Sequence, residues 1–282
     1  MTLAQSAGKD KDDCMNDAQF RQLLNRFEFS WSGYRKVRKG VKKRIGRYMK
    51  ASGCRTMAAL LAELEQNDET RHACELLMTV SISRFFRDRR FWETLEKILL
   101  PEIIQRRNEK ISVWSAGCAC GDEVFSFMIV WDRLSKNYSH LPSLEMTATD
   151  LNSAYLQRAR AGIYSTGSLK ELTPEIRSEY FTKKPGKKLF EVKDFLKKNI
   201  SWKIHHLLSD PPGRDFDIVF LRNSVLTYYE EKLKKRALEK VLSRLAPGGI
   251  LIIGSHESIP FETPDLGAVE PYPYVFKRAV VK

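Results

Sequence analysis

From residue 111 onward, hydrophobic and polar positions alternate between a strand-like and a helix-like pattern. The apolar stretch at 111–114 ends in small residues at 115–121, after which apolar positions recur at helical spacing through 124–131. Further strands are predicted at 143–150, 200–208, 216–221 and 250–254, and further helices at 152–161 and 231–245. Because strands alternate with helices, we predict an α/β fold with a doubly wound sheet whose ligand lies at the strand carboxyl ends.

The first 80 residues follow a different pattern, with no strand signal. Residues 1–15 are polar and are predicted to be a disordered tail. Helices are predicted at 17–24, 57–64 and 75–80, and across 30–50 the apolar positions Tyr34, Val37, Val41, Ile45 and Tyr48 recur at three- and four-residue steps. We therefore expect a tail at 1–15, a small helical domain at 16–80 and a larger domain at 81–282.

Within the larger domain, two regions depart from simple alternation. Residues 163–200 are rich in Lys, Gly and Pro, which predicts a small excursion of short strands, and 272–281 is predicted to add closing antiparallel structure. A helix is predicted over 91–104, with Pro101 breaking it near its end. We expect Phe85 and Phe86, just before this helix, to be core residues.

The predicted helix at 34–48 is strongly basic, and the whole chain carries a net charge of +13. Its bases fill the positions that the apolar stripe leaves open: Arg35, Lys36, Arg38, Lys39, Lys42, Lys43, Arg44 and Arg47. No acidic residue lies between Glu28 and Glu63, so these bases lack local i,i+4 partners. This favours a docking surface for an acidic helical partner, with a solvated face as the alternative.

Several classes of protein do not fit the composition. No run free of Asp, Glu, Lys and Arg exceeds twelve residues, so we expect no stable membrane insertion, and the polar start is unlike a secretory signal. A cytoplasmic monomer is expected. The five cysteines are an odd number without a CxxC pair, and Cys118 and Cys120 have no nearby histidine, which predicts reduced thiols and no metal site.

The turn after the first strand is the candidate ligand site. Gly117 and Gly121 let the backbone turn sharply and approach a ligand near the first free N–H groups of a helix. Asp150 ends the next strand, where nucleotide-binding α/β folds hold ribose hydroxyls. The Gly117-x-x-x-Gly121 spacing differs from the GxGxxG of dehydrogenases and favours another adenosine ligand, S-adenosylmethionine. An ordinary β–α turn is the alternative reading.

Several stretches, taken together and in order, resemble one known family from about residue 17 to residue 278. They are RKVRKGVKKRIGRYM, SRFFRD, WSAGCACGDEVFS, ATDLN, GIY, EYF, FDIVFLRN, VLTYY and LAPGGILIIGSHES. The chain resembles the CheR family of S-adenosylmethionine-dependent glutamate O-methyltransferases, which modify bacterial chemotaxis receptors. The resemblance implies a methyltransferase-type Rossmann-like sheet, a helical N-terminal domain for receptor docking and a β-subdomain inserted at 163–200. It also implies S-adenosylmethionine as cofactor and S-adenosylhomocysteine as product.

The resemblance also implies the site residues. Ser81, Ser83 and Arg87 match residues at the methyl end of the cofactor, Glu123 and Asp150 its amino-acid and ribose contacts, and His206 the adenine side. The implied cofactor-binding set is Ser81, Ser83, Arg87, Ala116, Gly117, Gly121, Glu123, Asp150, Leu151, His206, Leu207, Arg222 and Asn223. The implied catalytic residues are Arg87, which would hold the incoming carboxylate, and Tyr228, which would position the methyl end. A salt bridge to Asp88 is the alternative for Arg87, and simple packing the alternative for Tyr228.

The sequence departs from the family at a few positions. Cys120 replaces the usual Thr, Asp122 the usual Glu, Val124 the usual Pro and His206 the usual Asn. The stretch RNSVLTYYE is one residue longer than its family counterpart, so Tyr228 is aligned with the family tyrosine provisionally. These changes are typical of a divergent branch.

The implied chemistry asks little of the protein, since a glutamate carboxylate with a pKa of about 4.3 is already ionised and needs no general base. Most of the rate would come from proximity and orientation. A nucleic-acid methyltransferase is excluded because Asp210-Pro211-Pro212-Gly213 lacks an aromatic fourth residue and does not follow the fourth strand. An inactive S-adenosylmethionine-binding signalling module, or a methyltransferase with a substrate other than a chemoreceptor-like protein, remain as alternatives.

Overall fold

The computed structural model describes residues 15–107 and 109–280. The chain divides into two compact units that meet at residues 79 and 80. The tail predicted at 1–15 lies outside the described residues except for its last member, Met15.

The described part of the first unit is helical. Its helices are α1 (Asp17–Arg26), α2 (Arg38–Ala51), α3 (Met57–Gln66) and α4 (Asp68–Met78). Asn16 caps α1 in a reciprocal pair with Gln19, and the side chains of Thr56 and Asn67 cap α3 and α4. These caps satisfy backbone N–H groups that a helix start leaves open, which explains where three of the helices begin.

The basic helix is shorter than predicted, because α2 begins at Arg38 and residues 31–37 form turns. Tyr34, expected on the apolar stripe of the helix, is instead buried in the turns, where its hydroxyl donates to the Met78 carbonyl at 3.1 Å. Trp31 lies against the guanidinium of Arg38, with 3.4 Å between the Arg38 Cζ and the ring centroid. Aromatic contacts within the unit therefore override the helical periodicity over these seven positions.

The bases of α2 fall into two groups, and those of the first group have partners far along the chain in place of the local i,i+4 partners that the sequence lacks. Arg38 and Lys42 form ion pairs with Asp17 on α1, at 3.3 and 2.9 Å. Arg44 donates to the carbonyls of Leu77 and Thr79, both at 2.8 Å. These partners are distant in sequence, so inspection of local spacing could not find them.

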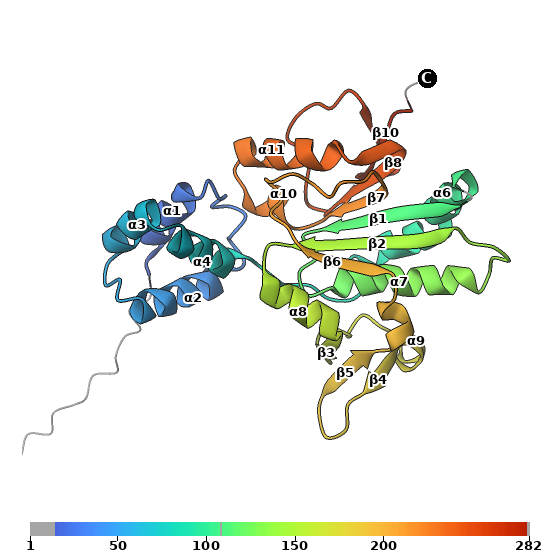
Figure 1. Ribbon diagram of the computed structural model, residues 1–282, viewed down its shortest axis with the longest axis horizontal. Coiled ribbons are helices and arrows are strands. Elements are labelled where there is room, and N and C mark those ends of the chain that lie inside the picture. The colour runs from blue at the N-terminus through green and yellow to red at the C-terminus, as the bar shows by residue number, and fades with distance from the viewer. Residues whose placement is uncertain (1–14, 108, 281–282) are drawn as a thin grey trace, which may run out of the picture. The chain divides into compact units, whose positions relative to one another are not determined.

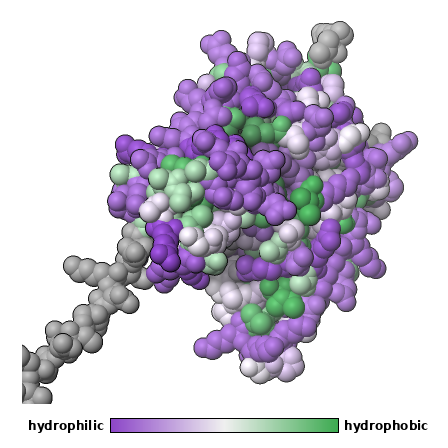
Figure 2. Space-filling view, turned by 60° about the vertical axis from the view of Figure 1, so that its left-hand side comes forward, coloured by the Kyte–Doolittle hydropathy of each residue, from purple (hydrophilic) through white to green (hydrophobic). Residues whose placement is uncertain are grey.

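A second group of bases is exposed along one face of α2. Lys39, Lys43 and Arg47 follow one another at four-residue steps, and Lys50 continues the row. We call these four residues the α2 basic row. The face of the molecule seen in Figure 2 is largely hydrophilic, with hydrophobic side chains in small separate groups.

The second unit is built on a mixed seven-stranded sheet in the order β6-β2-β1-β7-β8-β10-β9 (Figure 1). Its strands are β1 (Lys110–Ala116), β2 (Ser143–Asp150), β6 (Ile200–Ile204), β7 (Phe216–Leu221), β8 (Leu245–Ile253), β9 (Leu266–Val269) and β10 (Tyr272–Arg278). The strands from β6 to β8 pair in parallel, whereas β10 is antiparallel to both its neighbours. The order reverses between β1 and β7, so the predicted doubly wound α/β fold is confirmed, with its switch point at these two strands.

Alternate residues of the central strands supply the hydrophobic cores on the two faces of the sheet. Ile111 and Val113 of β1 belong to one core, with α7 (Asp122–Ser135), while Trp114 and Ala116 belong to the other, with α11 (Glu231–Leu242). Covering helices on both faces explain the nearly continuous apolar sequence of β7. The remaining helices that follow sheet strands are α8 (Ser153–Ala161) and α10 (Val225–Tyr228).

The strand predicted at 250–254 begins earlier, at Leu245, and runs through Pro247-Gly248-Gly249 with a register shift against β7 between Phe216 and Ile218. A Cβ on Gly249 would lie 2.8 Å from the Ala246 carbonyl oxygen, so glycine permits this irregular stretch of strand.

The helix predicted to be broken by Pro101 continues past it. It consists of α5 (Arg89–Thr94), a π-helical turn at Leu95–Leu99 and α6 (Leu100–Arg106). The wider i→i+5 turn directly precedes Pro101, where the usual i→i−4 hydrogen bond cannot form. The helix therefore absorbs the proline in this turn and ends at Arg106.

The predicted insertion is confirmed as a small antiparallel sheet in the order β3-β5-β4. Its elements are β3 (Ile163–Ser165), α9 (Pro174–Tyr180), β4 (Phe181–Lys183), β5 (Leu189–Val192) and a 3₁₀ turn (Asp194–Lys197). The Tyr180 hydroxyl donates to Asp132 of α7 at 2.9 Å, and the Tyr164 hydroxyl donates to the Cys120 carbonyl at 2.7 Å. The insertion thus contacts the loop after β1.

Across residues 15–107 and 109–280, no helix is long and apolar enough to cross a membrane.

Candidate functional site

The predicted site residues gather at the carboxyl ends of the parallel strands. Ala116 ends β1 and Gly117 follows it, Asp150 ends β2 and Leu151 follows it, His206 and Leu207 follow β6, and Arg222 and Asn223 follow β7. Ser81, Ser83 and Arg87 precede α5. The sheet order brings the ends of β2, β1 and β7 next to one another.

Gly117 lies where the loops after β1 and β7 approach each other. Its φ of 84° favours glycine, and its N–H donates to the Thr149 carbonyl at 2.8 Å. A Cβ at this position would lie 3.1 Å from the Ser224 Cβ and 3.4 Å from its Oγ. The buried Ser224 Oγ has no hydrogen-bond partner among the described residues. A polar atom in need of a partner therefore lies at the switch point, as expected where a polar ligand binds.

Gly121 makes the predicted sharp turn and also lies in a close-packed place, while its approach to a ligand stays a prediction. Its φ is 85°, and a Cβ there would lie 2.9 Å from the Ala159 Cβ and 3.1 Å from both the Trp202 ring and the Tyr164 hydroxyl. The missing side chain lets the start of α7 pack against α8, β6 and the insertion. Protein atoms, and not open space, occupy the position that a side chain would fill.

Asp150 holds the loop after β1 with one carboxylate oxygen and the loop after β2 with the other. Oδ2 accepts from the N–H of Ala119 at 2.9 Å, and Oδ1 accepts from the N–H of Asn152 at 2.8 Å. Burial raises the pKa of Asp150, and these two N–H groups oppose the rise. Each carboxylate oxygen can accept a second hydrogen bond, so Asp150 can hold the loop and bind a ligand hydroxyl together.

Glu123 and Arg222 form the centre of a buried ionic network. Glu123 accepts from the Ser115 hydroxyl at 2.8 Å and from Arg222 Nη1 at 3.2 Å. Arg222 also donates from Nη2 to Asp88 at 2.7 Å and lies 4.7 Å from the ring centroid of Phe91. Burial raises the pKa of Glu123, and the Arg222 charge opposes the rise. Protein groups surround the Arg222 side chain, which is 4% exposed, so the cofactor contact implied for it stays a prediction.

Arg87 does not form the salt bridge that was the alternative to its catalytic role. The Asp88 carboxylate pairs with Arg222, and the Arg87 guanidinium donates to the Ile82 carbonyl at 3.2 Å. In the part of the chain that the structure describes, no carboxylate lies within 4.0 Å of that guanidinium. The Arg87 carbonyl accepts from Trp92 Nε1 at 2.9 Å, which fixes the backbone while the side chain stays half-buried.

Tyr228 ends α10 within electrostatic reach of Arg87. Burial raises the pKa of Tyr228, and the positive charge of Arg87 opposes the rise. The next residue, Tyr229, packs against the core that contains α11. The provisional alignment of Tyr228 with the family tyrosine stays a prediction.

The other predicted residues line the same region. The Ser81 hydroxyl contacts the Cys120 thiol, whose pKa burial raises. His206 Nδ1 accepts from the N–H of Leu208 at 3.0 Å, and His205 packs edge-on against Trp114. Both Cys118 and Cys120 are buried with raised thiol pKa values, which makes them poor nucleophiles.

Sequence reasoning missed Glu257, whose carboxylate joins the loops after β7 and β8. The signal was available, because an acid shortly after a parallel strand lies at the same sheet edge as Asp150. The motif SHES drew notice only as part of a resemblance.

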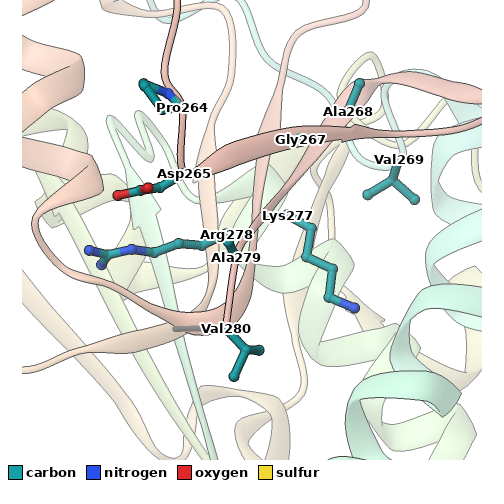
Figure 3. Close-up of a pocket in the computed structure, with 9 residues that line it drawn as sticks. All are labelled: Pro264, Asp265, Gly267, Ala268, Val269, Lys277, Arg278, Ala279 and Val280. Carbon is teal, nitrogen blue, oxygen red and sulfur yellow. The ribbon is translucent and has the colours of Figure 1, made fainter. Parts of the chain in front are cut away.

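A hollow of about 630 Å³ lies elsewhere, along the β9–β10 edge of the sheet (Figure 3). The residues that line it come from β9, β10 and the segments beside these strands, and none of them is a predicted site residue. The hollow is therefore separate from the predicted site residues.

Comparison with known proteins identifies the family. Residues 81–274 match the model of the CheR methyltransferase, SAM binding domain. A chemotaxis protein methyltransferase of Listeria monocytogenes is 35% identical over 183 residues, covering 65% of this chain and 67% of the relative. Chemotaxis protein methyltransferase 1 of Pseudomonas aeruginosa is 30% identical over 226 residues, covering 78% of this chain and 81% of the relative.

Solved structures are less similar. SAM-bound CalS10, an amino pentose methyltransferase from Micromonospora echinaspora, shares 17% identity at a TM-score of 0.33 and covers 57% of this chain and 50% of its own. N-methyltransferase NodS from Bradyrhizobium japonicum shares 14% identity at a TM-score of 0.36 and covers 67% of this chain and 97% of its own.

The residues at the strand ends fit an adenosine-containing ligand with polar ends. The carboxylate oxygens of Asp150 can accept further hydrogen bonds from hydroxyl groups, and the Ser224 hydroxyl at the switch point has no partner among the described residues. The family match spans more than half of the chain and names the cofactor-binding domain. The chain belongs to the CheR methyltransferase family, and S-adenosylmethionine is its cofactor.

Proposed function

We propose that this chain transfers a methyl group from S-adenosylmethionine to glutamate side chains of a chemoreceptor-like protein, with methyl esters as the product. The observation that carries the proposal is the state of Arg87. Its guanidinium is half-buried and within electrostatic reach of Tyr228, while the adjacent acid is bound to Arg222. An arginine in this position can bind a substrate carboxylate, because two of its N–H groups can donate to the two carboxylate oxygens at the same time.

Arg87 and Tyr228 would each orient one of the two reacting groups. Arg87 would hold the incoming carboxylate, and Tyr228 would donate a hydrogen bond near the transferred group. Because burial raises the pKa of Tyr228, its hydroxyl stays protonated at neutral pH and acts as a donor. It is therefore unsuited to remove a proton.

The reaction needs no general base. When bound, the cofactor supplies a methyl group on a positively charged sulfur, and an ionised glutamate is a sufficient nucleophile. The role of the protein is to align the substrate carboxylate with the methyl group and to keep the carboxylate in place. This alignment lowers the activation barrier of methyl transfer through proximity and orientation. Asp150, whose carboxylate contacts the loop after β1, would bind the ribose hydroxyls of the cofactor.

The α2 basic row provides a docking surface for the substrate in this proposal. Lys39, Lys43, Arg47 and Lys50 are exposed and form one positive face. An acidic helix of the substrate could lie along this face and bring its glutamates to the larger unit. Such docking would contribute association rate and specificity, because exposed charges act mainly on encounter.

Arg87→Ala tests the proposal in methylation assays with the cytoplasmic fragment of a chemoreceptor encoded in the same genome. The turnover number should fall at least tenfold, equivalent to about 1.4 kcal/mol of transition-state stabilisation, while affinity for S-adenosylhomocysteine changes little. Arg84→Ala is the matched control, because Arg84 lies in the same segment and pairs with Glu171 at 3.2 Å. Equal turnover in the two variants would remove Arg87 from the reaction.

A further inference from the structure

The carboxylate of Glu257 connects the two loops that follow β7 and β8. Its Oε2 accepts from the N–H groups of Asn223 at 2.8 Å and of Gly254 at 2.7 Å. Its Oε1 accepts from the Thr227 hydroxyl at 2.5 Å. One side chain therefore satisfies two backbone donors and one side-chain donor.

The backbone around this carboxylate leaves no room for a looser arrangement. A Cβ on Gly254 would lie 2.7 Å from Glu257 Oε2 and 3.1 Å from Asn223 Nδ2. Asn223 has a φ of 53°, a conformation that costs energy for a residue other than glycine. The Glu257 N–H donates to the Gly254 carbonyl at 2.9 Å, which closes the turn. The loops are therefore held in a strained and close-packed arrangement by this bridge.

The residues that Glu257 holds lie at both ends of the segment that carries Tyr228. Asn223 is the second residue after β7, and Thr227 directly precedes Tyr228 in α10. This helix has four residues, too few to be stable without outside support. The Tyr228 N–H donates to the Ser224 carbonyl at 3.0 Å, which links the tyrosine to the beginning of the same segment. Movement at either contact of Glu257 would therefore move Tyr228.

We propose that Glu257 is a positioning residue that sets the Tyr228 hydroxyl relative to Arg87 and so determines the rate of methyl transfer. The inference rests on the proposed roles of Tyr228 and Arg87. Glu257 acts as a hydrogen-bond acceptor in this role, and its negative charge is not required.

The comparison of Glu257→Gln with Glu257→Ala separates hydrogen bonding from charge. In the glutamine variant, the amide oxygen can accept from Asn223 and Gly254 while its NH₂ group donates to Thr227, whose hydroxyl can also accept. Glu257→Gln should therefore keep turnover within about threefold of wild type, whereas Glu257→Ala should lose about 100-fold, the effect of a small misplacement. Equal losses in the two variants, with both folded by thermal melting, would overturn the proposal.

A double-mutant cycle with Tyr228→Phe tests whether Glu257 acts through Tyr228. The loss caused by Glu257→Ala should shrink below about tenfold in the Tyr228→Phe background, because the hydroxyl to be positioned is already absent. Additive losses would contradict the proposal. Affinity for S-adenosylhomocysteine should change less than turnover in every variant, and a parallel fall in both would also contradict it, because a merely structural defect would reduce both.

Glu262→Ala is the control, since Glu262 is an exposed acid of the segment that follows Glu257. Its turnover should equal that of wild type. The cycle uses whichever protein the wild type labels, so it can be read even when the label is not a glutamate ester. A failure of the proposed function thus appears in the chemistry of the label, and a failure of this inference appears in the cycle.

Discussion

Asp88 accepts a hydrogen bond from Arg222, 2.7 Å from Nη2, although Arg87 is its neighbour in the chain. The positive φ of Asp88, 63°, marks a turn at this position, and the Arg222 side chain is buried there against Phe91. The pairing has two effects. It anchors the segment 85–88 to β7, and it leaves the Arg87 guanidinium available for another carboxylate.

Arg222→Met should destabilise the protein by about 3–5 kcal/mol, because it leaves the carboxylates of Glu123 and Asp88 without their shared partner in a buried site. Urea denaturation measures the free energy of unfolding. The control is Arg89→Ala, which breaks the exposed pair with Glu93 and should cost about 0–1 kcal/mol. Similar losses in the two variants would show that the network is not a structural centre.

Asp150→Ala should weaken binding of S-adenosylmethionine and S-adenosylhomocysteine by roughly five- to 150-fold, the loss of about 1–3 kcal/mol. Removal of the carboxylate frees the N–H groups of Ala119 and Asn152 and withdraws the acceptor for ribose. Calorimetric titration gives the affinities. Asp215→Ala, at an exposed acid near the start of β7, should leave them unchanged, and unchanged affinity in Asp150→Ala itself would refute the ribose assignment.

Reversal of Lys39, Lys43 and Arg47 to Glu should lower methylation of the protein substrate and leave cofactor affinity intact. The effect should weaken as salt rises, since exposed charges are screened within about 8 Å at physiological ionic strength. Lys42 is left unchanged, because it pairs with Asp17 and its loss would disturb the fold. Reversal of Lys97, Lys170 and Arg236, exposed bases of the larger unit, makes the same change in net charge. Equal methylation of the protein substrate by the two triple variants would show that the α2 basic row is a solvated face and not a docking surface.

The free energy of unfolding should decrease as pH rises, because the Asp122 carboxyl loses its proton at a higher pH in the native state than in the unfolded chain. Burial raises the pKa of Asp122 to about 6 from 3.8, so between these values the native carboxyl keeps a proton that the unfolded chain has lost. The native state then binds more protons, and the free energy of unfolding decreases with pH. The difference between wild type and Asp122→Asn should therefore fall by about 2 kcal/mol between pH 4 and pH 7, as followed by urea denaturation. A difference that stays constant with pH would show that Asp122 does not titrate in this range.

Regular patterns in the sequence predicted the regular parts of the fold. The strand at 143–150 and the strand at 216–221 match the structure residue for residue, because local alternation and apolar runs define buried parallel strands. The helix at 34–48 was misjudged at its start because Tyr34 packs against distant residues. The helix break predicted at Pro101 does not occur, because a π-helical turn accommodates the proline. No local pattern in the sequence predicts such a turn.

The candidate site was predictable where one residue acts alone near a strand end, as at Asp150. It was not predictable where the function of a residue depends on a partner far along the chain. Arg222 and Asp88 are 134 positions apart, and Glu257 and Asn223 are 34 apart. Three-dimensional proximity therefore excluded the salt bridge between Arg87 and Asp88, and it also revealed Glu257.

The chemical stability of the transferred label tests the central claim most directly. Wild-type protein is incubated with S-adenosylmethionine labelled in its methyl group and with the chemoreceptor fragment, and the labelled protein is then treated with mild base. A glutamate methyl ester hydrolyses under these conditions and releases volatile labelled methanol, which is the result predicted here. A label that stays on the protein through this treatment would be an N-methyl or similar group and would contradict glutamate methylation.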